Sequence, residues 1–107
     1  MTRKGYKQEY NVKKKLQKEY GDLAVIKVAI GSYLGDFIIL GKNSSVIKIV
    51  EVKKRKSRFR LTGREKEQYE KLKRIKEEFG IDVEYWIFSN RKLNIIKIED
   101  MEKFSKI

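Results

Sequence analysis

Cysteine, histidine and proline are all absent from the 107-residue sequence. Without cysteine, the chain has neither disulfides nor thiolate-bound metals. Without histidine, imidazole zinc sites and every catalytic triad that uses histidine are excluded. Any metal ion must therefore be bound by oxygen atoms, which favours Mg²⁺ or Mn²⁺.

Long apolar runs are missing as well. No stretch of about 18 apolar residues is present, so we expect no membrane-spanning helix. The opening stretch MTRKGYKQEY lacks the apolar segment of a signal peptide. We therefore expect a cytoplasmic protein, and the length fits a single domain over residues 1–107.

Positive charge is what the sequence has in excess. Lys and Arg number 27 against 15 Asp and Glu, for a formal net charge of +12. Such an excess is typical of proteins that bind a polyanion. A thermophile-type surface would also be rich in charge, but it tends to balance the two signs. Nucleic acid is therefore favoured over an anionic membrane surface or an acidic protein.

Apolar spacing and turn residues predict eight elements in the order αβββαββα. A helix between strands usually makes a crossover, so we expect an α/β fold with a mixed central sheet flanked by helices. The predicted helices cover residues 4–20, 63–79 and 99–106, and the predicted strands cover residues 23–30, 36–40, 46–53, 83–88 and 93–98.

The second predicted helix has clear ends. Thr62 followed by Glu65 is a capping box, and Gly80 is a typical stop. The apolar stripe of this helix is predicted at Tyr69, Leu72, Ile75 or Lys76, and Phe79.

The turn GKNSS predicts a hairpin that brings two acids together. A symmetric loop over residues 42–45 pairs residues whose numbers sum to 87, so that Asp36 faces Glu51. Opposed like charges about 5 Å apart cost roughly 3 kcal/mol at an effective dielectric near 20. A divalent cation would remove that cost, and Lys53 lies within reach of whatever the metal holds. The same register pairs Ile38 with Ile49, Leu40 with Ile47, and Gly41 with Val46.

Glu9 supplies a possible third acid. It precedes Val12 and Leu16 on the apolar stripe of the first helix, so it could point at the same sheet face as the other two acids. Structural roles remain open for each acid: Asp36 as a turn cap, Glu51 with Lys53 as an exposed strand pair, and Glu9 as a first-turn acid favoured by the helix dipole.

These residues resemble a known family. Asp36, then Glu51-Val52-Lys53 at the end of the paired strand, with Glu9 on the leading helix, resembles the PD-(D/E)xK restriction-endonuclease-like nucleases. The likeness from about residue 3 to residue 98 is closer to archaeal Holliday junction resolvases, although Gly35 stands where a proline often precedes the aspartate. The matching features are Gly5 before Glu9, Gly31-Ser32 before Asp36, the Glu51-x-Lys53 motif, a basic stretch, and a helix that bears Gln68 and ends in Phe79-Gly80.

The resemblance implies Mg²⁺-dependent cleavage of four-way DNA junctions, with Mn²⁺ able to substitute. It implies metal binding by Asp36, Glu51 and the Val52 carbonyl, with Glu9 on a second ion or a metal-bound water. Lys53 would orient the nucleophile, and Ser32 would close onto the DNA backbone. Another nuclease of the same superfamily, acting on flaps, mismatches or restriction sites, remains an alternative, as does a non-catalytic basic DNA-binding protein.

The basic residues after Lys53 are expected to bind DNA phosphates, although a solvated loop would explain such a run as well. Lys27 joins them because it stands where the resemblance places an arginine before the Gly-Ser loop. The predicted DNA-binding residues are Arg3, Lys4, Lys27, Ser32, Lys54, Arg55, Lys56, Arg58 and Arg60.

Cutting two opposed strands of a two-fold symmetric junction implies a C2 homodimer. The strand containing Tyr85, Trp86 and Phe88 is either core on both faces or core on one face and dimer interface on the other.

Overall fold

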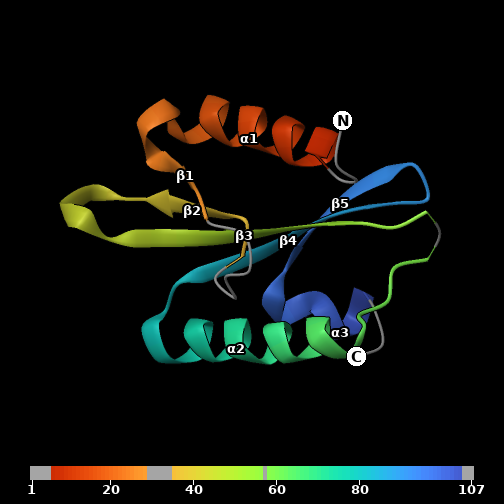
Figure 1. The fold of residues 1–107 in the computed structure, drawn as a ribbon. Coiled ribbons are helices and arrows are strands. Elements are labelled where there is room, and N and C mark those ends of the chain that lie inside the picture. The colour runs from red at the N-terminus through yellow and green to blue at the C-terminus, as the bar shows by residue number, and fades with distance from the viewer. Residues whose placement is uncertain (1–5, 29–34, 57, 105–107) are drawn as a thin grey trace.

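The computed structural model describes residues 6–28, 35–56 and 58–104 and contains a five-stranded sheet between helices (Figure 1). The strand order is β1-β2-β3-β4-β5, and β3 and β4 are parallel while the other neighbours are antiparallel. This arrangement confirms the predicted mixed sheet and the order αβββαββα. The elements are α1 (Tyr6–Tyr20), β1 (Val25–Lys27), β2 (Phe37–Leu40), β3 (Val46–Lys54), α2 (Gly63–Phe79), β4 (Asp82–Ser89), β5 (Lys92–Lys97) and α3 (Met101–Phe104).

Helices cover both faces of the sheet and bury a separate apolar cluster under each. Figure 1 shows α1 on one face and α2 with α3 on the other. Successive residues of a strand point to opposite faces, so Val50 packs with α1 whereas Ile49 packs with α2. In β4, Trp86 packs on the α1 face and Tyr85 on the α2 face, and both are buried. This strand is therefore core on both faces within one chain.

The observed hairpin register agrees with the predicted one near the acids and differs at the turn. Ile38 pairs with Ile49 as expected, but Leu40 pairs with Val46 instead of Ile47. A bulge between Ile39 and Leu40 absorbs the difference. Asn43 takes a left-handed conformation with φ of 62° inside the turn, which shortens the loop by one residue from the expected symmetric form.

The start of β1 and the exposure of Phe79 also differ from the prediction. A short 3₁₀ turn over Asp22–Ala24 precedes β1, so the described strand is shorter than the predicted 23–30. Phe79, predicted in the apolar stripe of α2, is 69% exposed. Ile81, just past the helix, packs against the α2-side cluster instead. No helix in the described part of the chain is long and apolar enough to cross a membrane.

Candidate active site

Asp36 and Glu51 lie together at the end of the β2–β3 hairpin; we call them the acid pair. Phe37 pairs with Val50, so the next residues outward face each other. Glu51 is only 5% exposed. The Val52 N–H donates a hydrogen bond of 2.7 Å to Asp36 Oδ2, which fixes the aspartate against β3.

The environment of Asp36 opposes its ionisation. Burial, followed by the negative charge of Glu51, raises the pKa of Asp36 to about 8. The hydrogen bond from the Val52 N–H acts in the opposite direction, and hydrogen bonding and charge from Glu9 add to the rise. The acid pair therefore holds a proton near neutral pH unless a bound cation replaces that proton.

Gly35 permits the close approach that creates the acid pair. Its φ of +91° lies in the region that favours glycine, and proline is excluded there because its ring fixes φ near −65°. A Cβ at this position would lie 2.9 Å from Ile49 Cγ2 and 3.0 Å from the Val50 carbonyl oxygen. A proline, which often stands at this position in the nucleases that the sequence resembles, would therefore not fit the local backbone.

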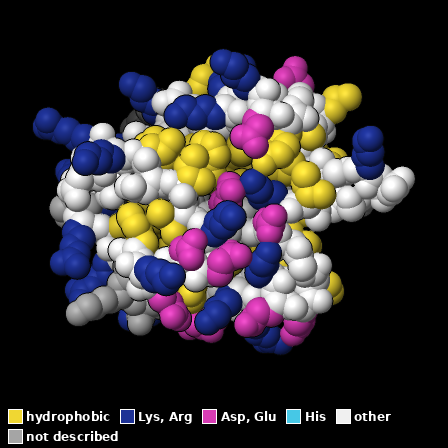
Figure 2. Space-filling model, turned by 180° about the vertical axis from the view of Figure 1, so that it is seen from behind, with side chains coloured by type: hydrophobic (Ala, Val, Ile, Leu, Met, Phe, Trp, Pro, Cys, Tyr) yellow, Lys and Arg dark blue, Asp and Glu magenta, His cyan; other side chains and the backbone are white. Residues whose placement is uncertain are grey.

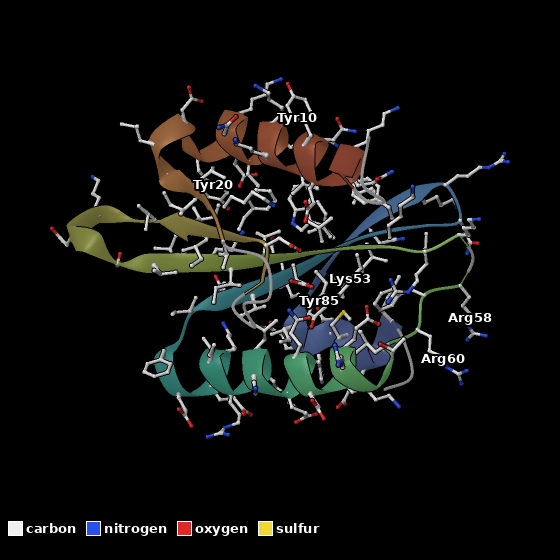
Figure 3. The ribbon with its side chains drawn as sticks, in the orientation of Figure 1. Tyr10, Tyr20, Lys53, Arg58, Arg60 and Tyr85 are labelled. Atoms are coloured by element: carbon white, nitrogen blue, oxygen red, sulfur yellow. The ribbon has the colours of Figure 1, made fainter. Side chains whose placement is uncertain are left out.

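Lys53 extends from β3 toward α2 and is held by partners from both elements (Figure 3). Its Nζ lies 2.6 Å from Glu51 Oε2 and 3.4 Å from Glu65 Oε2. It also donates a hydrogen bond of 3.3 Å to Gln68 Oε1. The ammonium group is therefore fixed beside the acid pair and is largely shielded from solvent.

Glu9 reaches the site from a different direction than expected. It belongs to α1, which packs on the Val50 face of the sheet, whereas strand alternation places Glu51 on the α2 face. Glu9 forms an ion pair of 3.2 Å with Lys27 and also interacts with Asp36. Within the described ranges, no three acidic side chains are grouped so that they could hold a metal ion. The expected sheet face is therefore wrong for Glu9, but its interaction with Asp36 still brings it to the acid pair, and its role at a metal ion stays a prediction.

The acid pair nevertheless suits a divalent cation. Its ligands are carboxylate oxygens, which Mg²⁺ prefers. The repulsion from Glu51 that helps raise the pKa of Asp36 is the interaction that a bound cation would relieve. The Val52 carbonyl remains a predicted ligand.

The predicted phosphate-binding residues differ in their surroundings. Arg58 and Arg60 point outward from the segment after β3 (Figure 3), and Lys54 and Lys56 are exposed like them. Arg55 is different, because its Nη2 donates hydrogen bonds to both carboxylate oxygens of Glu65.

Three predicted residues, Arg3, Lys4 and Ser32, lie outside the described residues. Lys27 is engaged with Glu9, and its ammonium also lies 5.4 Å from the centre of the Phe37 ring. The DNA-binding roles of all these residues stay predictions.

Glu65 is a site residue that the sequence did not reveal. Burial raises the pKa of Glu65, but hydrogen bonds from Arg55 and the Thr62 N–H, together with the charges of Lys53 and Arg55, outweigh it and lower the pKa to about 2. The sequence signalled only the capping box with Thr62, which is present. Nothing local connects Glu65 with Arg55, ten residues earlier, because only the packing of α2 beside β3 brings them together.

Comparisons with known proteins support the fold. No protein-family model matches the chain, and no curated protein matches it. A solved structure does: Hjc, a Holliday junction resolvase from the archaeal hyperthermophile Archaeoglobus fulgidus, has a TM-score of 0.51 and 21% sequence identity. The match covers 83% of this chain and 75% of that chain. The chain has a resolvase-like fold.

Proposed function

We propose that the chain is a Mg²⁺-dependent, structure-selective DNA endonuclease that resolves four-way junctions as a C2 homodimer. The observation that carries the proposal is the acid pair with Lys53 Nζ at 2.6 Å from Glu51. A carboxylate pair beside a lysine at the end of a hairpin suits phosphodiester hydrolysis, because it unites a cation site with a fixed positive charge. The resolvase-like fold and the net charge of +12 support a branched-DNA substrate.

Each side chain of the candidate site has a separate role in the proposed hydrolysis. Asp36 and Glu51 would hold the ion, whose chemistry there would be to lower the pKa of a water molecule and to offset negative charge on the phosphate. The Val52 N–H keeps Asp36 in place through its hydrogen bond. Lys53 donates to the attacking oxygen or the phosphate, and its contact with Gln68 keeps the ammonium from leaving the site. Exposed cations after β3 hold the flanking phosphates.

The test compares a labelled four-way junction with a linear duplex of matched sequence, each with and without Mg²⁺. We expect cleavage of the junction only with Mg²⁺, leaving 5′-phosphate and 3′-hydroxyl ends. Lys53→Ala should lower the single-turnover rate by about 100- to 1,000-fold, because one fixed donor to the transition state is lost. Its junction affinity should stay near that of the wild type.

Lys66→Ala is the matched control, because Lys66 is an exposed lysine on α2. It should leave the rate unchanged. Equal cleavage of the duplex would favour a flap-, mismatch- or restriction-type nuclease on the same fold. Binding without any metal-dependent cleavage would instead identify a non-catalytic DNA-binding protein.

A further inference from the structure

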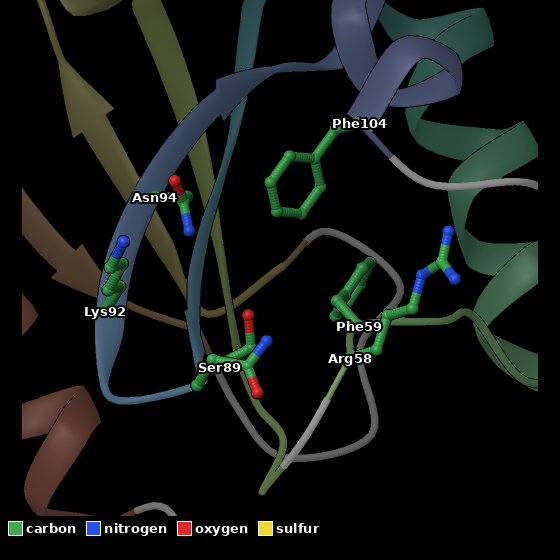
Figure 4. Close-up of a pocket in the computed structure, with 7 residues that line it drawn as sticks. Arg58, Phe59, Ser89, Lys92, Asn94 and Phe104 are labelled. Carbon is green, nitrogen blue, oxygen red and sulfur yellow. The ribbon is translucent and has the colours of Figure 1, made fainter.

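A cavity lies beyond the acid pair, at the end of the sheet where β3 and β4 terminate. Its volume is about 280 Å³. Neither acid lines it, so it is separate from the candidate active site. Figure 4 shows its main lining residues, which are Arg58, Phe59, Ser89, Lys92, Asn94 and Phe104.

The two walls of this cavity differ in chemistry. Phe59 and Phe104 form an aromatic wall, with ring centres 6.1 Å apart and planes tilted by 42°. The β4–β5 hairpin forms the opposite wall with Ser89, Lys92 and Asn94, and Figure 4 shows the rings across the cavity from these groups. An aromatic surface opposite an amide and a cation is the combination that nucleotide-binding sites use.

The polar wall follows a tight turn, and its Lys92 ammonium and Asn94 amide are available. Asn90 and Arg91 have φ values of 50° and 62°, which are typical of a type I′ hairpin turn. Within the part of the chain that the structure describes, the side chains of Lys92 and Asn94 form no hydrogen bond or ion pair. A ligand would therefore meet donors that need not first break an internal contact.

The cavity is in line with the catalytic lysine. Lys53 is the register partner of Ile87, and Ile87 is the register partner of Asn94. These three residues therefore form one row across β3, β4 and β5, and Lys53 and Asn94 are about 10 Å apart by two inter-strand spacings. Ile87 is buried, so the row gives the separation and not the route. At this separation, a DNA strand held at the acid pair could place a nearby nucleotide over the cavity.

We propose that this cavity takes one unpaired nucleotide of the DNA strand held at the acid pair; the proposal rests on the proposed nuclease function. The base lies against the aromatic wall, mainly against Phe104 because Phe59 is only 5% exposed. The Asn94 amide meets the edge of the base, and Lys92 and Arg58 meet the phosphates on either side of the nucleotide. The volume is just below the range of small-ligand pockets, about 300–1,000 Å³, which suits one base and excludes a duplex. The preferred substrate is thus a junction with an unpaired nucleotide at its branch point.

The experiment uses two four-way junctions that differ only in one unpaired fluorescent purine analogue at the branch point. Affinities are measured in EDTA, so that nothing is cut. We expect the wild type to bind the junction with the unpaired analogue about tenfold more tightly, as one stacked base contributes, and to change the analogue's emission. Equal affinity for both junctions would overturn the proposal.

Variants connect the preference with the cavity. Lys92→Gln combined with Asn94→Ala should remove the tenfold preference and the emission change. Lys97→Gln, an exposed lysine farther along β5, is the matched control and should keep both. If the double variant still prefers the junction with the unpaired analogue, the unpaired base binds elsewhere and the proposal is wrong.

Cleavage assays with Mg²⁺ distinguish this proposal from the nuclease function. If the chain is not a nuclease, neither junction is cut, whatever their affinities. If the chain is a nuclease without this subsite, both junctions are bound and cut alike.

Discussion

At the scale of single residues, Asp36 contributes to how stability depends on pH. Its pKa in the folded protein is about 8, above the ordinary value of 3.8, so the folded state binds the proton more tightly than the unfolded state. The resulting stabilisation is complete below about pH 4 and is lost as the pH rises through about 8. One unit of pKa shift is worth about 1.4 kcal/mol, so the loss is on the order of a few kcal/mol.

This linkage predicts the behaviour of Asp36→Asn. Without divalent metal, the melting temperature of the wild type should fall between pH 5 and pH 8, whereas that of Asp36→Asn should change much less and be higher at pH 8. Added Mg²⁺ should raise the wild-type value at pH 8 more than that of the variant. Asp100→Asn, at an exposed acid, is the control. A wild-type pH dependence retained in Asp36→Asn would contradict the assignment.

The facing position of the acid pair could be predicted from the sequence because it depends on local rules. Strand period and a short turn fix which residues face each other. The register error at Leu40 did not reach Asp36, because a bulge between the turn and the acid pair absorbs it. The partners of Lys53 could not be predicted in the same way. Glu65 and Gln68 reach it only through the packing of α2.

At the scale of elements, Glu65 ties the start of α2 to β3 and to the chain that follows it. It accepts a 2.9 Å hydrogen bond from the Thr62 N–H as part of the capping box, and it also binds Arg55. Glu65→Ala should therefore lower the free energy of unfolding by about 1–2 kcal/mol at pH 7. Glu67→Ala, at an exposed acid on the same helix, should change it little.

The pH dependence of this difference follows from the lowered pKa of Glu65. Its contribution is present above the unfolded value of 4.5 and is lost as the pH falls through about 2. Chemical denaturation of the wild type, Glu65→Ala and Glu67→Ala at pH 7 and pH 3 measures how the free energy of unfolding changes. Equal stability of Glu65→Ala and Glu67→Ala at pH 7 would show that the contacts of Glu65 contribute nothing.

The type and order of the helices and strands could be predicted from the sequence. How these elements pack against one another was harder to predict. Gly80, with φ of +69°, ends α2 where the sequence places the stop. The sequence did not show which face of the sheet α1 would cover, so Glu9 was expected beside Glu51. It also did not show that Phe79 would lie beyond the packed part of α2. Both depend on how whole elements dock, which periodicity along one element does not specify.

At the scale of the whole molecule, we expect DNA binding to depend more on the position of the positive charge than on its total. Figure 2, seen from behind, shows Lys and Arg side chains along the left margin. In Figure 3, on the corresponding right side, Arg58 and Arg60 point away from the sheet. Lys42 and Lys97 belong to the opposite end, where the β2–β3 turn lies and where β5 pairs with the start of β4. Two variants that each remove two charges can therefore separate position from net charge.

Arg58→Gln combined with Arg60→Gln should weaken junction binding and reduce the slope of log K against log salt concentration by about 0.9 for each lost phosphate contact, or roughly two in all. Lys42→Gln combined with Lys97→Gln removes the same charge and should leave the slope nearly unchanged. The slopes come from binding titrations at several salt concentrations in EDTA. An equal loss of slope in both variants would mean that DNA responds only to the overall charge. A loss confined to the arginine variant would place the DNA backbone at the end of the sheet where β3 leads into the basic segment, beside Lys53.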